Sequence, residues 1–234
     1  MGDKFIVKNI CKSFGGLKAV EDFNLALPGS DVVTFIIGPN GAGKTTVVNL
    51  LAGALTPDRG SIMLDGRDVT GMKLIHRARS GIARTFQQTG IFSRLTPREH
   101  LFLSTKQKQN SLIDKLLEDF ALTSFADIPV MGLNHVSQRL LEICMIVSMK
   151  PEVIMLDEPT AGMDSIEVDQ VAKAINKIRK LCTIIIVEHD MEFVFRLADQ
   201  ILVLDTGRTI AFGSPGEIKR NERVHESYVG GLTI

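Results

Sequence analysis

The chain has 234 residues, 44% of them hydrophobic, so it can bury the core of one large domain. Lysine plus arginine and aspartate plus glutamate number 27 each. This balance excludes the basic excess typical of nucleic-acid-binding proteins and of proteins held on anionic membranes. The three cysteines are isolated, as is typical of free thiols in a reducing cytosol. No apolar run approaches the roughly 20 residues that span a bilayer, so we expect any membrane role to be peripheral.

The first predicted strands and helix lie before residue 55. FIVKNI (5–10) alternates like a strand with one buried face, whereas VVTFIIG (32–38) is continuously apolar, as in a strand buried on both faces. Glycines follow this second strand directly, and a helix is predicted at about 44–54.

In the last third of the chain, apolar strands again alternate with helices. VIMLD (153–157) and TIIIVE (183–188) are predicted buried strands, separated by an amphipathic helix at about 165–180. Another helix is expected to begin near Asp190. ILVLDTGRTIAFG (201–213) is predicted to be a hairpin that turns at Thr206-Gly207.

Strands that alternate with helices indicate an α/β fold with a mostly parallel sheet. Residues 88–137 interrupt this alternation, because they are polar, helix-prone and without a convincing central strand. We therefore predict one domain over 1–234, with an α/β core formed by 1–87 and 138–234 and an inserted helical subdomain at 88–137.

The motif GPNGAGKTT (38–46) satisfies the phosphate-loop pattern G-x-x-x-x-G-K-[ST]. Glycines let backbone N–H groups curl around phosphate oxygens, and the following helix presents its positive end to the same anion. Lys44 is predicted to reach the β- and γ-phosphates, and the Thr45 hydroxyl to bind Mg²⁺. The alternative is a plain glycine turn. The predicted nucleotide-binding residues of this loop are Gly38, Asn40, Gly41, Gly43, Lys44, Thr45 and Thr46.

Two adjacent carboxylates end the strand at 153–157. Asp157 is placed to hold Mg²⁺, and Glu158 to polarise a water molecule that attacks the γ-phosphate. Acidic residues at strand ends are also common in ordinary loops. Downstream of a phosphate loop, the pair predicts nucleotide hydrolysis.

LDEPTAGMD (156–164) and IIIVEHDM (184–191) resemble the ATPase subunits of ATP-binding-cassette (ABC) transporters over nearly the whole chain. GGLKAV (15–20), GIARTFQ (81–87) and IFSRLTPREHL (91–101) resemble, more narrowly, the branched-chain amino-acid importers of that family. The resemblance implies a P-loop NTPase fold of RecA-like type with an antiparallel β portion, and ATP and Mg²⁺ as ligands.

The resemblance also implies roles for further residues. Gln87 corresponds to the glutamine that senses γ-phosphate and Mg²⁺, and His189 to the histidine that contacts the γ-phosphate. Gly162 and Asp164 fall in the D-loop, through which two cassettes communicate, and Phe14 corresponds to the aromatic that stacks on adenine. The alternatives are that Phe14 belongs to the core and that His189 merely begins a helix.

HVSQRLLE (135–142) departs from the family pattern, which reads LSGGQ or LSYGQ followed by QRRLEIA. Val136-Ser137 is followed directly by QRLLEI, and aligned through Leu141-Glu142-Ile143 the sequence lacks three residues of the pattern, the glycines among them. Ser137 is then the remnant of a signature loop shortened near 136–138, or simply the cap of a helix starting near Gln138. A signature without its glycine predicts one impaired ATP site, and hence a heterodimer with another cassette in preference to a homodimer.

The resemblance therefore predicts an ATPase subunit on the cytoplasmic face of a membrane. We expect it to work with transmembrane permease subunits and a second cassette, and without nucleic acid. It would power import of branched-chain amino acids or related small solutes. One alternative is a regulatory cassette with little turnover, because the signature is truncated. Others are a soluble cassette of DNA repair or translation, and a P-loop kinase.

Overall fold

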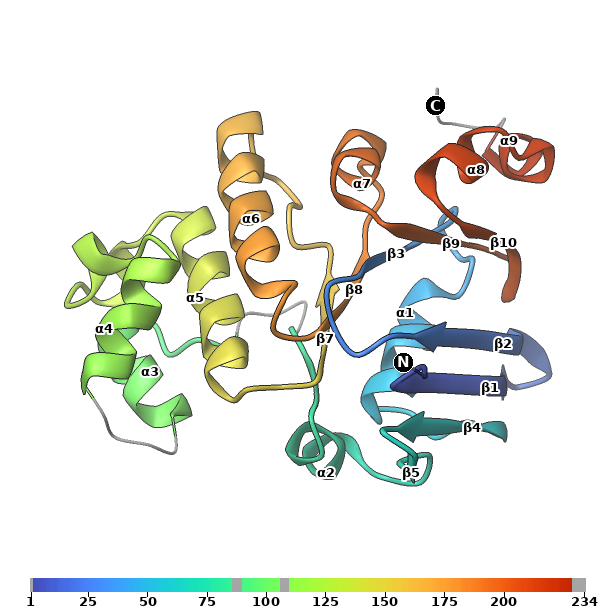
Figure 1. The fold of residues 1–234 in the computed structure, drawn as a ribbon, viewed down its shortest axis with the longest axis horizontal. Helices are drawn as coiled ribbons and strands as arrows, with labels where there is room; N and C mark the ends of the chain where they lie inside the picture. The colour runs from blue at the N-terminus through green and yellow to red at the C-terminus, as the bar shows by residue number, and fades with distance from the viewer. Residues whose placement is uncertain (1, 86–89, 106–109, 229–234) are drawn as a thin grey trace.

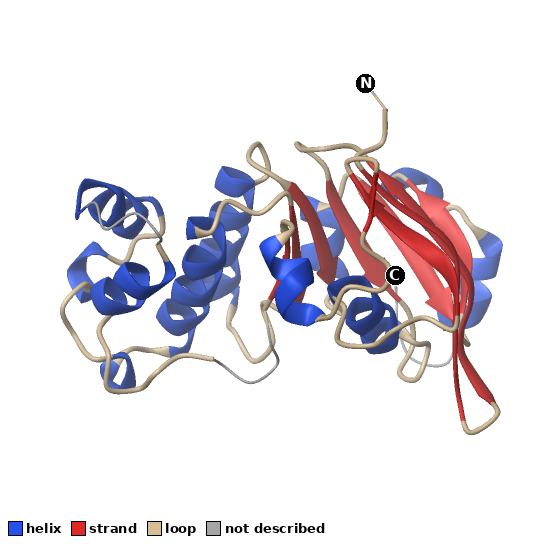
Figure 2. Ribbon diagram, turned by 90° about the horizontal axis from the view of Figure 1, so that it is seen from below, coloured by secondary structure: helices blue, strands red, loops and turns tan. Residues whose placement is uncertain are grey.

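The computed structural model of the chain describes residues 2–85, 90–105 and 110–228. Two β-sheets and the helices packed on them form one end of the molecule, and a group of helices forms the other (Figures 1 and 2). No helix of the described residues is long and apolar enough to cross a membrane.

The first sheet is antiparallel, with strand order β2-β1-β4-β5. The prediction of a strand at 5–10 is confirmed, and the strand continues to Phe14, which pairs with Leu17 across a tight turn. The sequence analysis did not predict the other three strands. Its strands are β1 (Phe5–Phe14), β2 (Leu17–Leu27), β4 (Arg59–Leu64) and β5 (Arg67–Asp68).

The second sheet has strand order β10-β9-β3-β8-β7-β6. All neighbouring pairs are parallel except β9 and β10, which form the predicted hairpin. Thr206 and Gly207 both have positive φ, as a two-residue turn of the hairpin type requires. The strands are β3 (Val33–Ile37), β6 (Ile82–Arg84), β7 (Val153–Asp157), β8 (Thr183–Val187), β9 (Gln200–Asp205) and β10 (Arg208–Gly213).

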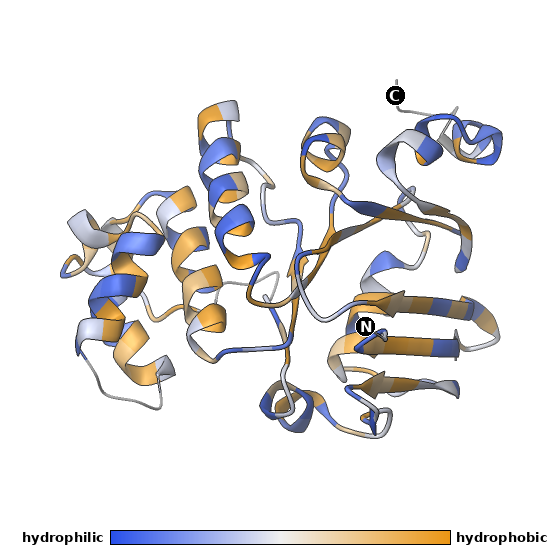
Figure 3. Ribbon diagram, in the orientation of Figure 1, coloured by the Kyte–Doolittle hydropathy of each residue, from blue (hydrophilic) through white to orange (hydrophobic). Residues whose placement is uncertain are grey.

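The central strands of this sheet are buried on both faces, as their unbroken apolar runs predicted. In β3, Phe35 and Ile37 face one hydrophobic core, whereas Ile36 between them faces the other. Figure 3 shows these strands as mostly hydrophobic, while α6 carries a hydrophilic side. The sheet therefore separates two cores and needs helices or a second sheet on each side.

Helix α1 (Lys44–Ala52) lies between the two sheets, and Val47 and Leu51 pack in the core that they share. The predicted helices at 44–54, at 165–180 and from Asp190 are confirmed within a few residues. The helices after α1 are α2 (Leu74–Arg79), α3 (Pro97–Ser104), α4 (Asn110–Asp119), α5 (His135–Ser148), α6 (Ser165–Ile178), α7 (Met191–Leu197), α8 (Pro215–Lys219) and α9 (Glu222–Tyr228), with 3₁₀ turns at Thr123–Phe125 and Val130–Gly132.

The helices α3 and α4 pack against α5, which in turn packs against α6. Leu101 of α3 and Leu117 of α4 join the same core as Leu141 and Ile143 of α5. Helix α5 thus links the helices of the predicted insertion to the large sheet. The division of the chain at residues 87 and 138 stays a prediction.

Arg77 is the largest fully buried side chain, at 0% exposure. Its Nη1 donates to the carbonyls of Leu50 and Leu51 in the last turn of α1, and its Nη2 donates to the carbonyls of Val69 and Thr70. Burial lowers the pKa of Arg77 to about 10, so the guanidinium stays charged at neutral pH. One side chain therefore satisfies the end of the helix that carries the phosphate loop and the segment that precedes α2.

Candidate functional site

The phosphate loop runs from the end of β3 to the start of α1, and two of its glycines are required by close backbone contacts. A Cβ atom at Gly38 would lie 2.2 Å from the Leu204 carbonyl oxygen. Gly43 has φ of 100° and precedes the first turn of α1, and a Cβ there would lie 2.5 Å from the Ala19 carbonyl oxygen. The backbone of strand β2 and that of the β9–β10 hairpin therefore lie so close to the loop that only glycine fits at these two positions.

Lys44 folds back over this loop. Its Nζ donates to the carbonyl of Gly38 at 2.6 Å and to that of Pro39 at 2.9 Å. Burial lowers the pKa of Lys44, and the nearby charges of Glu158 and Asp157 oppose that shift. The ammonium group is thus placed between the loop and the two predicted hydrolysis residues. Thr45 is exposed and Thr46 half-buried in the first turn of α1, while Asn40 and Gly41 are exposed on the loop.

Asp157 ends β7 and is only 3% exposed. Burial raises the pKa of its carboxyl group, and the nearby Arg84 opposes this shift. The Arg84 Nη2 atom lies 3.6 Å from Asp157 Oδ2, and this oxygen accepts no hydrogen bond from the residues that the structure describes. A buried carboxylate oxygen without a hydrogen-bond donor suits a hard cation such as Mg²⁺, so the donor set fits the predicted metal.

Glu158 follows directly and has φ of 46°, which is rare for a residue with a side chain. Its carboxylate is partly exposed, and Oε1 lies 3.8 Å from His189 Nδ1. The loop after β8 supplies His189, whose side chain is 64% exposed. His189 does not begin α7: Asp190 caps that helix by accepting from the N–H groups of Glu192 and Phe193. The structure thus brings together Lys44, Asp157, Glu158 and His189 from three segments of the chain.

The other predicted residues lie around this centre. Phe14 is 46% exposed at the end of β1, which rules out a core role, and Lys12 Nζ lies 5.7 Å from its ring centroid. Gly162 is exposed, and Asp164 caps α6 by accepting from the N–H groups of Ile166 and Glu167. Gln87 lies outside the described residues.

The prediction that Ser137 caps a helix starting near Gln138 is wrong. Helix α5 begins at His135, and its N-cap is Asn134, whose Oδ1 accepts from the Ser137 N–H at 3.0 Å. Ser137 is buried in the first turn. Asparagine caps helices as well as serine does. Of the three residues before Ser137, only Asn134 is of a type that commonly caps a helix. The local sequence therefore offers two residues of capping type, and the helix begins after the first of them.

Sequence analysis missed several residues that hold this centre in place. Arg84 donates through Nη1 to Asn49 Oδ1 of α1, and the Asp157 N–H donates to Thr85 Oγ1. Glu188 accepts from Thr160 and from His189. Only the position of Glu188 next to His189 could have suggested a role, since the other contacts join residues distant in sequence.

The sequence profile of the ABC transporter family matches residues 20–161. The chain belongs to the ABC transporter family. It is 35% identical to the high-affinity branched-chain amino acid transport ATP-binding protein BraF of Pseudomonas aeruginosa, over 96% of each chain. It is 31% identical to the lipopolysaccharide export system ATP-binding protein LptB of Haemophilus influenzae, over 95% of each chain.

Solved structures of cassettes share the fold. A crystal structure of an ATP-binding cassette in its ADP conformation superposes with a TM-score of 0.88 at 27% identity, covering 98% of this chain and all of that one. The predicted P-loop NTPase fold is thus confirmed, and this cassette is an ATP-binding ATPase.

The observed start of α5 changes how this cassette compares with the family's signature pattern. Counted back from Leu141, the sequence LSYGQ followed by QRRLEIA runs to Leu133 without a gap. Asn134, the helix cap, then stands at the serine and Val136 at the glycine. No three-residue deletion is required, and the departure from the pattern consists of substitutions. The Val136 side chain packs in the core, 2% exposed, so it does not cover the start of the helix.

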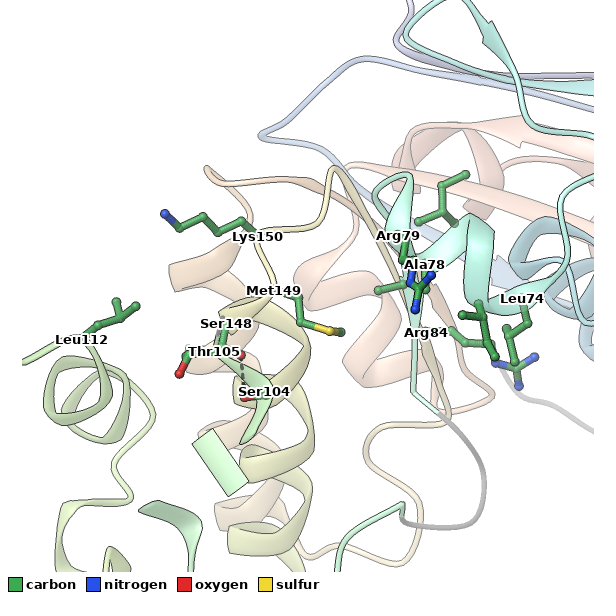
Figure 4. A pocket seen from close by; sticks show the side chains of 13 residues that line it. Leu74, Ala78, Arg79, Arg84, Ser104, Thr105, Leu112, Ser148, Met149 and Lys150 are labelled. Atoms are coloured by element: carbon green, nitrogen blue, oxygen red, sulfur yellow. Dashed lines mark hydrogen bonds between the residues drawn. The ribbon is translucent and has the colours of Figure 1, made fainter. Parts of the chain in front are cut away.

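A pocket of about 500 Å³ lies away from the phosphate loop, between α2, β6 and the ends of α3 and α5 (Figure 4). Exposed apolar side chains of Ile75 and Met149 border it, and Arg84 reaches it from the β6 side. Because Arg84 also lies beside Asp157, this pocket and the candidate metal site share one side chain.

Proposed function

We propose that this cassette powers an importer of branched-chain amino acids or related small solutes, from the cytoplasmic face of the membrane. The observation that carries the proposal is the 35% identity to BraF over 96% of each chain. The identity to an export protein, LptB, is somewhat lower at 31%. The relatives give no support for the alternative of a regulatory cassette with little turnover, and the gapless signature register removes the reason for it.

We propose that ATP binds with its phosphates on the loop amides and Lys44. Mg²⁺ would be held by the Thr45 hydroxyl, by Gln87 and by Asp157, and would neutralise charge on the phosphates. Glu158 would accept a proton from the attacking water, and His189 would contact the γ-phosphate. The nearby Glu158 and His189 side chains, both partly open to solvent, support these two roles.

Calorimetric titration of the folded chain with ATP and magnesium tests the nucleotide site. We expect saturable binding at one site per chain, because the loop amides, the α1 N-terminus and Lys44 converge on one anion. Lys44→Ala removes the cation and is expected to weaken binding by at least about tenfold, since a charge-assisted hydrogen bond contributes about 1.5–3 kcal/mol. Lys73→Ala, which removes an exposed lysine outside the loop, is the matched control. Absence of saturable heat would contradict the assignment.

We propose that the permease subunits contact a face made of helices α3 and α4 and the pocket of Figure 4, and that Gln87 takes part in transmitting this contact. Ile75 on α2 and Met149 just after α5 are exposed apolar residues that line this pocket, and Phe102 is an exposed apolar residue of the neighbouring helix α3. These residues support the proposal. ATP-driven closure of two cassettes would move this face, and the permeases would follow that movement.

We propose that the partner cassette is a different chain, so that two unlike ATP sites form. The support is the substitution of the signature serine by Asn134, an exposed residue, which changes the side chain offered to the opposite nucleotide. Gly162 and Asp164 would communicate across that interface. Purified alone, the chain is expected to turn over ATP more slowly than when mixed with a second cassette that carries an intact signature. Equal turnover in a steady-state phosphate-release assay would contradict the heterodimer.

A further inference from the structure

Glu188 is a buried carboxylate, 1% exposed, between two segments of the candidate site. Its Oε1 accepts from the Thr160 N–H at 3.1 Å and also from the Thr160 hydroxyl. Its Oε2 accepts from the His189 N–H at 2.9 Å. Both carboxylate oxygens are therefore used, and they join the chain just after Glu158 to the chain at His189.

The turn that these bonds close contains backbone strain. Glu158 has φ of 46°, a conformation that side-chain-bearing residues adopt only when the surroundings hold them there. On one side, the Glu158 N–H donates to the Val187 carbonyl at 2.9 Å. On the other side, Thr160 is held by Glu188. The strained residue is thus fixed from both ends, by the same β8 strand end that carries His189.

We propose that Glu188 is a positioning residue for ATP hydrolysis: it holds Glu158 and His189 at a fixed separation by bonding to Thr160 and to the His189 backbone. This inference rests on the proposed roles of Glu158 and His189, which Glu188 itself does not share. Both carboxylate oxygens accept hydrogen bonds from Thr160 or from the His189 N–H, so Glu188 acts through the geometry of Glu158 and His189.

The substitution that tests this role is Glu188→Gln, because it keeps the shape and removes one acceptor. Oε1 accepts from the Thr160 backbone N–H and Oε2 from the His189 backbone N–H, so in either orientation the glutamine NH₂ group meets a backbone N–H that can only donate. The variant therefore loses either the contact with Thr160 or the contact with the His189 N–H. A displacement of about 1 Å in catalytic geometry lowers turnover by about 10²-fold.

The experiment measures ATP turnover and ATP binding of the full chain in its assembly with a partner cassette. Glu188→Gln is expected to lower kcat by about 10²-fold with KM unchanged within about threefold, and with one ATP bound per chain by calorimetry. A purely structural role would instead lower kcat and the number of binding-competent chains together. Glu192→Gln makes the same charge change on an exposed residue of α7 and serves as the matched control.

Thr160 variants keep the test decisive if Glu188→Gln does not fold. Thr160→Val removes the hydroxyl donor at constant shape and is expected to lower kcat. Thr160→Ser keeps the hydroxyl and is expected to keep the original kcat. In Glu188→Gln, adding Thr160→Val should cause little further loss, because both changes break one contact. Full kcat in Glu188→Gln or in Thr160→Val overturns the inference. If Glu158→Gln also retained turnover, the proposed function itself would fail.

Discussion

Replacing Glu158 by glutamine is expected to lower ATP hydrolysis by about 10²–10⁴-fold, the range that a positioned general base contributes. ATP binding should remain, since the phosphate loop and Lys44 do not depend on this carboxylate for their hydrogen bonds. The amide keeps the size of the side chain and cannot take a proton from water. Single-turnover phosphate release and calorimetry on the same preparation measure the two quantities.

The control for this prediction is a carboxylate outside the site. Glu192→Gln is expected to leave turnover within about twofold of the original chain, because exposed substitutions away from special features have small effects. If the Glu158→Gln variant hydrolysed ATP at the rate of the original chain, Glu158 would not be the general base. Loss of ATP binding in that variant would show that its effect reaches the phosphate loop.

Replacing Arg77 by methionine is expected to lower the free energy of unfolding by about 3–5 kcal/mol. The methionine fills part of the buried volume but removes the guanidinium donor from four backbone carbonyls. The carbonyls of Leu50 and Val69 keep the N–H groups of Gly53 and Met72 as donors, whereas those of Leu51 and Thr70 lose the donor that Arg77 supplied. Each buried unsatisfied polar group costs about 1–3 kcal/mol, and structural relaxation recovers part of that total. Urea unfolding followed by circular dichroism measures the change.

Arg79 provides the matched control for the Arg77 prediction. It lies on the same helix, α2, two residues further on, and is exposed. Arg79→Met should change the free energy of unfolding by less than about 0.5 kcal/mol. If the two variants unfolded at the same urea concentration, the four hydrogen bonds of Arg77 would not contribute to stability. Because Arg77 holds the end of α1, its loss should also weaken ATP binding.

Local pattern was sufficient for much of the fold. The unbroken apolar run at 32–38 and the two near 155 and 185 became the buried parallel strands β3, β7 and β8. The alternation in β2 is visible at residues 23–27, yet the strand went unpredicted, since its first half mixes charged and apolar residues without a clear period. Short strands such as β6 carry too few residues to show a period at all.

The candidate site divides in the same way. A contiguous motif determined the phosphate loop, because the curve of the backbone needs glycines at fixed spacing. Asp157 and Glu158 could be named because they stand at the end of a recognisable buried strand downstream of the phosphate loop, whereas His189 was named through the family resemblance. The cap of α5 was assigned to Ser137 when Asn134 lay three residues earlier, since either residue type caps a helix.

The sequence by itself determined the nucleotide-binding loop, the parallel strands and the family, because each depends on residues that are neighbours along the chain. Only the tertiary structure decided what holds these parts in register. Arg77 bonds to carbonyls up to 27 residues away, and Glu188 bonds to Thr160 across 28 residues. Such contacts form because buried polar groups need hydrogen-bond partners, and the fold decides which donors and acceptors lie near them. The spacing of residues along the sequence does not show which groups will meet.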